Sequence, residues 1–264
     1  MLMEVRNQIK VIFLSLKYNI MREMTNKITF LSNILFMILN NSSFIIQWVV
    51  LFSLKQEIGG YTMKEIILLW GIASGTFGLS KIVFSRAFEL SELIMEGKLD
   101  TFLVQPKNVF LSAITSETKI SAIGDLIYGY ICLFIYGLTI KNFVLFTIFL
   151  ITGGIITASF ASIVNCVSFW IVKGDFFADA LSNIMIDFAT YPGNIFKEGV
   201  KILFYTVIPV GISNYLPVET IINFNLVNFV CIIGFTGIIV SVAFAVFYKG
   251  LKRYSSSNLM NSRI

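Results

Sequence analysis

The sequence predicts an all-α integral membrane protein, a polytopic helical bundle, and two observations carry that prediction. Of its 264 residues, 56% are hydrophobic and only 13% are charged, far outside the range of soluble domains. The apolar residues form long continuous runs rather than the short alternating segments of a transmembrane barrel. A helix satisfies each backbone group within its own segment, as lipid requires. We therefore expect a single transmembrane domain over residues 1–264.

Each long apolar run predicts one membrane span. The six expected spans are residues 28–54, 63–84, 109–138, 143–172, 176–191 and 225–248. In the second span, Gly71, Gly75 and Gly78 form a stripe of small residues, which predicts close contact with a neighbouring helix. The first span carries the polar residues 40–43 at mid-depth, and these either face a cavity or hydrogen-bond to neighbouring helices.

Residues 176–191 are only weakly apolar, because Asp179, Asn183 and Asp187 recur at every fourth position. They share one helical face, and that face cannot point at lipid because charged groups are costly in hydrocarbon. The face either lines a translocation path or bonds to groups inside the bundle. Asp125, in the third span, has the same two alternatives.

Prolines divide residues 193–217 into two apolar pieces that are each too short to span a membrane comfortably. We expect this stretch to be a re-entrant segment on the external side. In a competing assignment, residues 200–216 form the fifth span and residues 174–198 lie in the cytoplasm. Both assignments leave the two termini on the same side.

Basic residues predict the orientation. Of 20 Lys and Arg, five precede the first span, four lie between Lys81 and Lys107, and four lie between Lys249 and Arg263. This asymmetry predicts that both termini are cytoplasmic. Residues 1–27 have a basic and an apolar helical face, which predicts an interfacial helix on the lipid membrane.

The central segment, residues 85–108, carries too many charges for hydrocarbon and must lie in water between two spans. Acidic residues recur on one helical face and apolar residues on another, which predicts an amphipathic helix. These residues are Glu89, Glu92 and Glu96 on the first face and Leu90, Leu93 and Ile94 on the second. Gly97 ends this helix, and Pro106 stops a second, shorter apolar piece.

Motifs of catalytic, nucleotide-binding and metal-binding sites are absent from the sequence. It contains no GxxxxGK[ST] phosphate loop, no GxGxxG motif, no histidine, and no Cys or carboxylate cluster with metal-ligand spacing. We expect no catalytic site, no metal and no cofactor in this chain. The net charge of +5 comes from the cytoplasmic flanks, so no nucleic acid is needed to explain it.

Four short motifs in order resemble a type-2 ABC transporter permease, and together they cover nearly the whole chain. They are Gly97-Lys98-Leu99-Asp100 with Pro106, Tyr191-Pro192, Ile208-Pro209 with Pro217, and Gly250-Leu251 with Tyr254. The resemblance implies a subunit of a bacterial exporter that moves a drug, peptide or lipid-like molecule across the cell membrane. It also implies two partners, a second permease subunit and ATPase subunits that bind ATP and magnesium.

In such permeases the segment between spans two and three inserts into a groove of the ATPase, so residues 85–108 are called the coupling segment below. The residues that the resemblance assigns to coupling are Glu89, Glu92, Glu96, Gly97, Lys98, Leu99, Asp100 and Pro106. The plain alternative is a solvated loop helix. Two other functions stay open: a secondary transporter or channel that uses Asp125, Asp179 and Asp187 as ion sites, and a non-transporting membrane scaffold.

Overall fold

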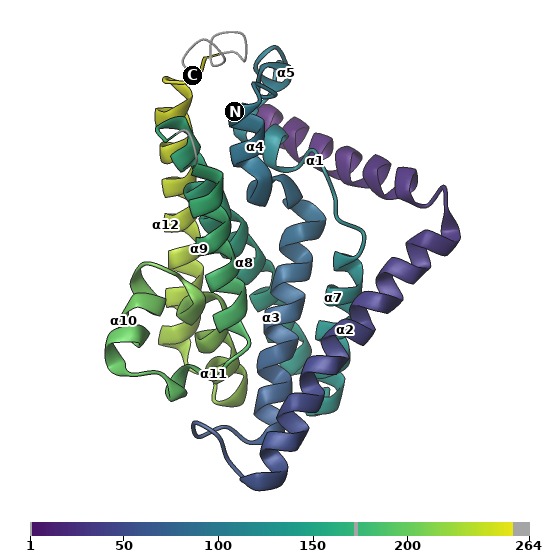
Figure 1. Ribbon diagram of the computed structural model, residues 1–264, viewed down its shortest axis with the longest axis vertical. Helices are drawn as coiled ribbons and strands as arrows, with labels where there is room; N and C mark the ends of the chain where they lie inside the picture. The colour runs from purple at the N-terminus through teal and green to yellow at the C-terminus, as the bar shows by residue number, and fades with distance from the viewer. Residues whose placement is uncertain (1, 172–173, 256–264) are drawn as a thin grey trace.

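The computed structural model describes residues 2–171 and 174–255, and within them all regular secondary structure is helical, without strands (Figure 1). The α-helices are α1 (Leu2–Glu23), α2 (Lys27–Leu54), α3 (Met63–Val83), α4 (Leu90–Met95), α5 (Asp100–Leu103), α6 (Val109–Ile114), α7 (Ala122–Gly137), α8 (Ile140–Asn165), α9 (Gly174–Ala189), α10 (Glu198–Thr206), α11 (Leu216–Ile222) and α12 (Leu226–Leu251). The 3-10 turns are η1 (Ser85–Glu89), η2 (Cys166–Phe169) and η3 (Gly193–Ile195), and η4 (Gly211–Tyr215) is a π turn.

Among the described residues, four helices are long and apolar enough to cross a membrane: α2, α3, α8 with η2, and α12. They confirm long apolar helices at the first, second, fourth and last predicted spans. Side chains cap their first turns, because the early N–H groups of a helix have no partner within it. The Asn26 side chain accepts from the Thr29 N–H at 3.2 Å, and Asn225 accepts from the Val227 N–H at 2.8 Å. The predicted end of the fourth span, Val172, lies outside the described residues.

The prediction of one continuous third span over residues 109–138 is wrong. A non-helical link, residues 115–121, separates α6 from α7, and α7 has only 16 residues. The link carries charged residues that pair with the coupling segment, and Glu117 Oε2 lies 2.6 Å from Arg86 Nε. Unpaired charged groups are costly in hydrocarbon, and the break in the helix allows the charged residues of the link to pair with those of the coupling segment.

The stretch from α9 to α11 departs from regular spans. With 16 residues, α9 is about 24 Å long, less than the roughly 30 Å of a hydrocarbon core. Helix α10 and the helix of residues 211–222 meet at an angle of 84°, with Pro209 at the break. The described chain thus has four candidate spans, or five if this bent pair counts as one, and the predicted six are not reached. The re-entrant assignment of residues 193–217 stays a prediction.

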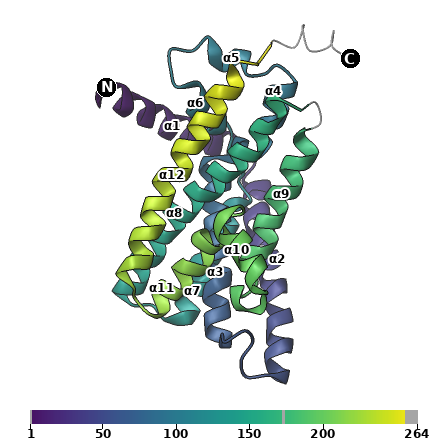
Figure 2. The same cartoon turned by 90° about the vertical axis from the view of Figure 1, so that its left-hand side faces the viewer.

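Helices α1, α4, α5 and the C-terminal end of α12 lie at one end of the molecule, and α10 and the turn before α3 lie toward the other (Figure 1). Helices α12, α8 and α9 run side by side (Figure 2). The predicted glycine stripe packs α3 against α7. A Cβ on Gly129 would lie 2.8 Å from the Gly71 carbonyl oxygen and 3.0 Å from the Gly75 Cα, so glycine is required at this crossing.

Candidate functional site

The coupling segment folds into three short pieces, η1, α4 and α5, at the same end as α1 (Figure 1). Helix α4 stops before Gly97, as the sequence predicts. Gly97 has φ +72°, a left-handed conformation that side chains with a Cβ rarely adopt, so the chain can reverse between α4 and α5. Helix α5 ends at Leu103, ahead of Pro106. The segment is therefore a compact folded unit.

The apolar face of the coupling segment is buried. Leu90, Ile94 and Leu99 have no exposed surface. They belong to a cluster that joins the segment to α6, η2 and the end of α12, called here the coupling-end cluster: Ala87, Phe88, Leu90, Leu93, Ile94, Leu99, Phe110, Ala113, Ile114, Ala158, Ala161, Cys166, Phe169, Ala243 and Phe247. Each large side chain buried in this way contributes about 1.5–3 kcal/mol. Packing thus fixes the segment to three separate parts of the bundle.

Arg86 is the centre of an ion-pair network on the segment. Its guanidinium lies 2.6 Å from Glu117, 3.2 Å from Glu89 and 3.6 Å from Glu92. Lys119 Nζ adds a contact to Glu89 at 3.4 Å. Because these groups come from η1, α4 and the link before α7, the network holds the three together. Glu89, assigned by resemblance to contact a partner, is bound within the chain.

Lys98 pairs with two glutamates of the segment, Glu92 and Glu96. Its Nζ donates to Glu92 Oε1 at 3.1 Å and also contacts Glu96 Oε2. Hydrogen bonds to Glu96 and Glu92 raise the pKa of Lys98 above its usual value. The Glu92 and Glu96 side chains are 44% and 49% exposed, so both can also reach a protein docked on this end.

The C-terminal motif lies against the coupling segment. A side chain at Gly250 would collide with the Phe169 ring, and the Tyr254 ring stands edge-on to that ring with centroids 6.4 Å apart. Burial and the neighbouring Asp100 carboxylate raise the pKa of Tyr254 to about 12. Two motifs separated by most of the chain therefore meet at one place, next to the fully buried Leu99.

Two polar contacts that the sequence analysis missed complete the anchoring. Asn165, with no exposed surface, accepts from the Ser91 N–H at 3.2 Å and donates to the Ala161 carbonyl at 2.8 Å, which ties α4 to α8. The Gln8 side chain accepts from the Asn108 N–H at 3.2 Å, which ties α1 to the end of the segment. A lone amide within an apolar run, such as Asn165, is the signal that could have found the first contact.

The four residues considered for a translocation path do not lie together. Asp179, Asn183 and Asp187 share one exposed face of α9, whereas Asp125 is buried on α7 with 4% exposure. Only Asp125 and Asp187 line a common cavity.

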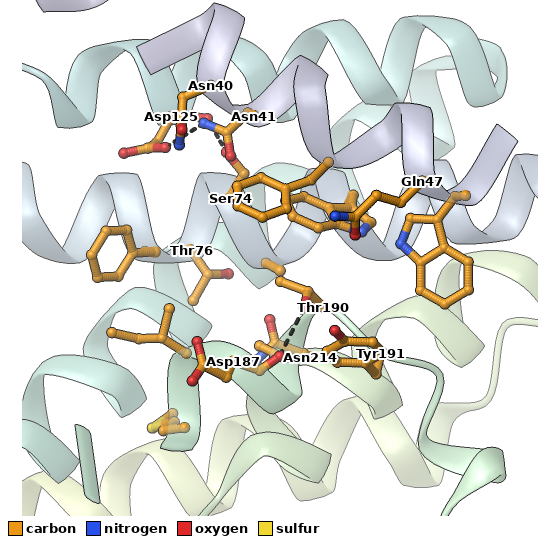
Figure 3. A pocket seen from close by; sticks show the side chains of 18 of the residues that line it. Asn40, Asn41, Gln47, Ser74, Thr76, Asp125, Asp187, Thr190, Tyr191 and Asn214 are labelled. Carbon is orange, nitrogen blue, oxygen red and sulfur yellow. Dashed lines mark hydrogen bonds between the residues drawn. The ribbon is translucent and has the colours of Figure 1, made fainter. Parts of the chain in front are cut away.

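That cavity, of about 660 Å³, lies between α2, α3 and α9. One wall carries Asn41, Ser74 and Asp125, and the facing wall carries Asp187 and Asn214 (Figure 3). Asn41 Nδ2 donates to Asp125 Oδ1 at 2.6 Å, and Ser74 Oγ donates to the Asp125 backbone carbonyl at 2.8 Å. Both alternatives for the polar residues of the first span therefore hold at Asn41, which lines a cavity and bonds to a neighbouring helix.

No group of three His, Cys, Asp or Glu residues is placed to hold a metal ion anywhere in residues 2–171 and 174–255. A family model described as "ABC-2 family transporter protein" matches residues 37–258, which include the coupling segment and every helix from α3 to α12. No curated protein and no solved structure shows a significant match to the chain.

Proposed function

Because the chain belongs to the ABC-2 transporter family, we propose that it is the transmembrane permease subunit of an ATP-driven ABC exporter. The family match over residues 37–258 carries the proposal. In this assignment the chain binds no nucleotide itself, and ATP and magnesium are bound by a separate ATPase subunit that docks on the coupling segment. A second permease subunit, identical or homologous, completes the membrane part.

The anchoring of the coupling segment supports a mechanical role. Its buried apolar face, the Arg86 network and the Asn165 contact join it to α6, α8 and the link before α7. A displacement of the segment by ATPase closure is therefore passed to several helices at once, since packed interiors transmit strain. The proposed outcome is alternating access, in which a drug, peptide or lipid-like substrate leaves the cytoplasm.

We place the chain in the bacterial cell membrane with both termini cytoplasmic and α1 on the inner surface. Two observations support this orientation: the Lys and Arg asymmetry, and the common end shared by α1, α4, α5 and the C-terminal end of α12 (Figure 1).

The test is co-purification of the ATPase with the tagged full chain from membranes of its own host. Reversing two exposed charges, Glu92→Lys with Glu96→Lys, should weaken the complex about tenfold, because each rim charge changes docking by up to about 1 kcal/mol. The ATP hydrolysis that co-purifies with the chain should fall in proportion.

Glu57→Lys is the matched control, because Glu57 is an exposed acid in the turn before α3, at the opposite end of the molecule. This variant should keep the ATPase. Undiminished co-purification with the double variant, at normal protein levels, would refute the coupling assignment.

A further inference from the structure

The cavity between α2, α3 and α9 contains buried polar atoms that have no hydrogen-bond partner among the described residues. Four of them line it: Trp70 Nε1, Thr76 Oγ1, Asp125 Oδ2 and Asn214 Oδ1. The four side chains have 7%, 2%, 4% and 2% exposure, respectively. Buried polar atoms are nearly always bonded, since leaving one unpaired is costly. Such a concentration at one cavity is expected where a ligand supplies the missing partners.

The chemistry of these atoms indicates the charge of the ligand. Asn41 holds Asp125 Oδ1 and leaves Oδ2 open. Asp187 adds a second carboxylate, and none of the described residues lining the cavity is Lys or Arg. A buried carboxylate is costly without a positive charge beside it. Asp125 Oδ2 and Asn214 Oδ1 are both acceptors, so they suit a group that is cationic and carries N–H donors.

The aromatic residues of the cavity lining indicate the chemistry of the uncharged part of the ligand. Phe44 stacks on Trp70 with ring centroids 5.3 Å apart, and Trp48 meets Tyr191 edge-on at 6.0 Å. Aromatic faces attract both apolar groups and cations. The volume of about 660 Å³ is that of a site for a drug-sized molecule.

We propose that this cavity binds an amphipathic organic cation, with its ammonium group on Asp125 and its apolar body against the aromatic residues of α2 and α3. The proposal rests on the assignment of the chain as an exporter permease, and it names the substrate class of that permease. In this proposal Asp125 contacts the ligand. Asp179, on α9, lies outside the cavity lining and has no part in binding.

The test is direct binding to the full chain in lipid nanodiscs, without the ATPase. The probe is dansylcadaverine, a primary ammonium on a dansyl group, compared with its neutral N-acetyl derivative. The chain has three tryptophans, and Trp170→Phe leaves Trp48 and Trp70, both in the cavity lining, as energy donors to the dansyl group. The cationic probe should bind at least about tenfold more tightly than the neutral one, because hydrogen bonds to charged groups are the strong ones.

Asp125→Asn should remove that tenfold difference and leave the neutral probe unaffected. Asp179→Asn, which removes the same charge from an exposed site outside the cavity, should change neither affinity. Gln47→Glu adds a carboxylate at an exposed position of the lining, without removing a buried contact, and should tighten cation binding about threefold or more.

Equal binding of the two probes to the parent protein would overturn the proposal, as would an unchanged preference in both Asp125→Asn and Gln47→Glu. Because these measurements need no ATPase, their failure leaves the exporter assignment standing. A failure of the co-purification test of ATPase docking would, in turn, not affect the proposed cation site.

Discussion

The coupling segment and the cavity between α2, α3 and α9 differ in how their polar groups are paired. In the described residues of the segment, the buried Ser85 hydroxyl lacks a hydrogen-bond partner, but the glutamates are paired. At the coupling segment, Arg86, Lys98 and Lys119 pair with every glutamate of the segment, and the apolar face is buried. The cavity has fewer charges, yet four buried polar atoms along its walls lack hydrogen-bond partners within residues 2–171 and 174–255. The glutamate charges of the segment are thus neutralised within the chain, whereas in our proposal a bound cation supplies the missing partner of Asp125 at the cavity.

The largest expected effect is the loss of packing at the coupling segment. Leu90→Ala, at a fully buried position of the coupling-end cluster, should destabilise the protein by about 2–5 kcal/mol, because the neighbours close the gap only in part. Thermal unfolding in a Cys231→Ser background can be followed by the reaction of the buried Cys132 and Cys166 with a thiol-reactive dye. Leu39→Ala, at a 55% exposed position of α2, is the control. Similar losses in both variants would show that the cluster does not anchor the segment.

A smaller loss is expected from the ion-pair network. Arg86→Gln leaves Glu89 and Glu117 without their shared guanidinium in a site where Arg86 is only 22% exposed, and should cost about 1–3 kcal/mol. Lys98, which is 50% exposed, is the matched control, and Lys98→Gln should cost less than about 1 kcal/mol. Added salt should narrow the difference in unfolding temperature between Arg86→Gln and the parent protein. Equal costs for the two variants would mean that the network is no more structural than a surface pair.

Tyr254 should give the coupling segment a pH dependence in alkaline solution. Its pKa is raised from 10.0 to about 12 by burial and by Asp100, so between these values the folded protein keeps a proton that the unfolded chain has lost. Stability contributed by the neutral hydroxyl is fully present below pH 10 and falls as pH rises toward 12.

The unfolding temperature of Tyr254→Phe should therefore decline less than that of the parent protein over this range. Tyr18→Phe, at a 62% exposed position, is the control. Parallel declines in Tyr254→Phe and the parent would rule out a buried contact between Tyr254 and Asp100.

The smallest effect, and the one of opposite sign, is expected at the cavity. Thr76→Val removes an unpaired hydroxyl at nearly constant shape, so stability without ligand should stay the same or rise by up to about 1 kcal/mol. Ser74→Ala removes a hydroxyl that is bonded to the Asp125 carbonyl and should cost about 0.5–1.5 kcal/mol. A loss at Thr76 as large as that at Ser74 would show that the cavity hydroxyls are equally satisfied and would weaken the contrast between the two regions.

Predictions that depended on local sequence were largely confirmed. The long apolar runs became α2, α3, α8 and α12, Gly97 ended the first helix of the coupling segment, and the glycine stripe of α3 became a helix contact. The continuous third span failed, because local hydropathy does not reveal that Glu117 pairs with Arg86. The path residues were only partly located, since helical spacing groups Asp179 with Asp187 but gives no information on which of them faces a cavity.

The sequence by itself determined that the chain is a helical membrane protein with one charged segment between spans two and three, because hydropathy and helical periodicity act over a few neighbouring residues. Only the tertiary structure decided which charged groups form ion pairs within the chain and which buried polar atoms lack hydrogen-bond partners among the described residues. Asn41 and Asp125 are 84 residues apart, and Ser91 and Asn165 are 74 apart, so these contacts depend on how the helices pack. The same packing leaves Asp125 Oδ2 at the cavity without a partner in the part of the chain that the structure describes, and residue spacing in the sequence could not have predicted this.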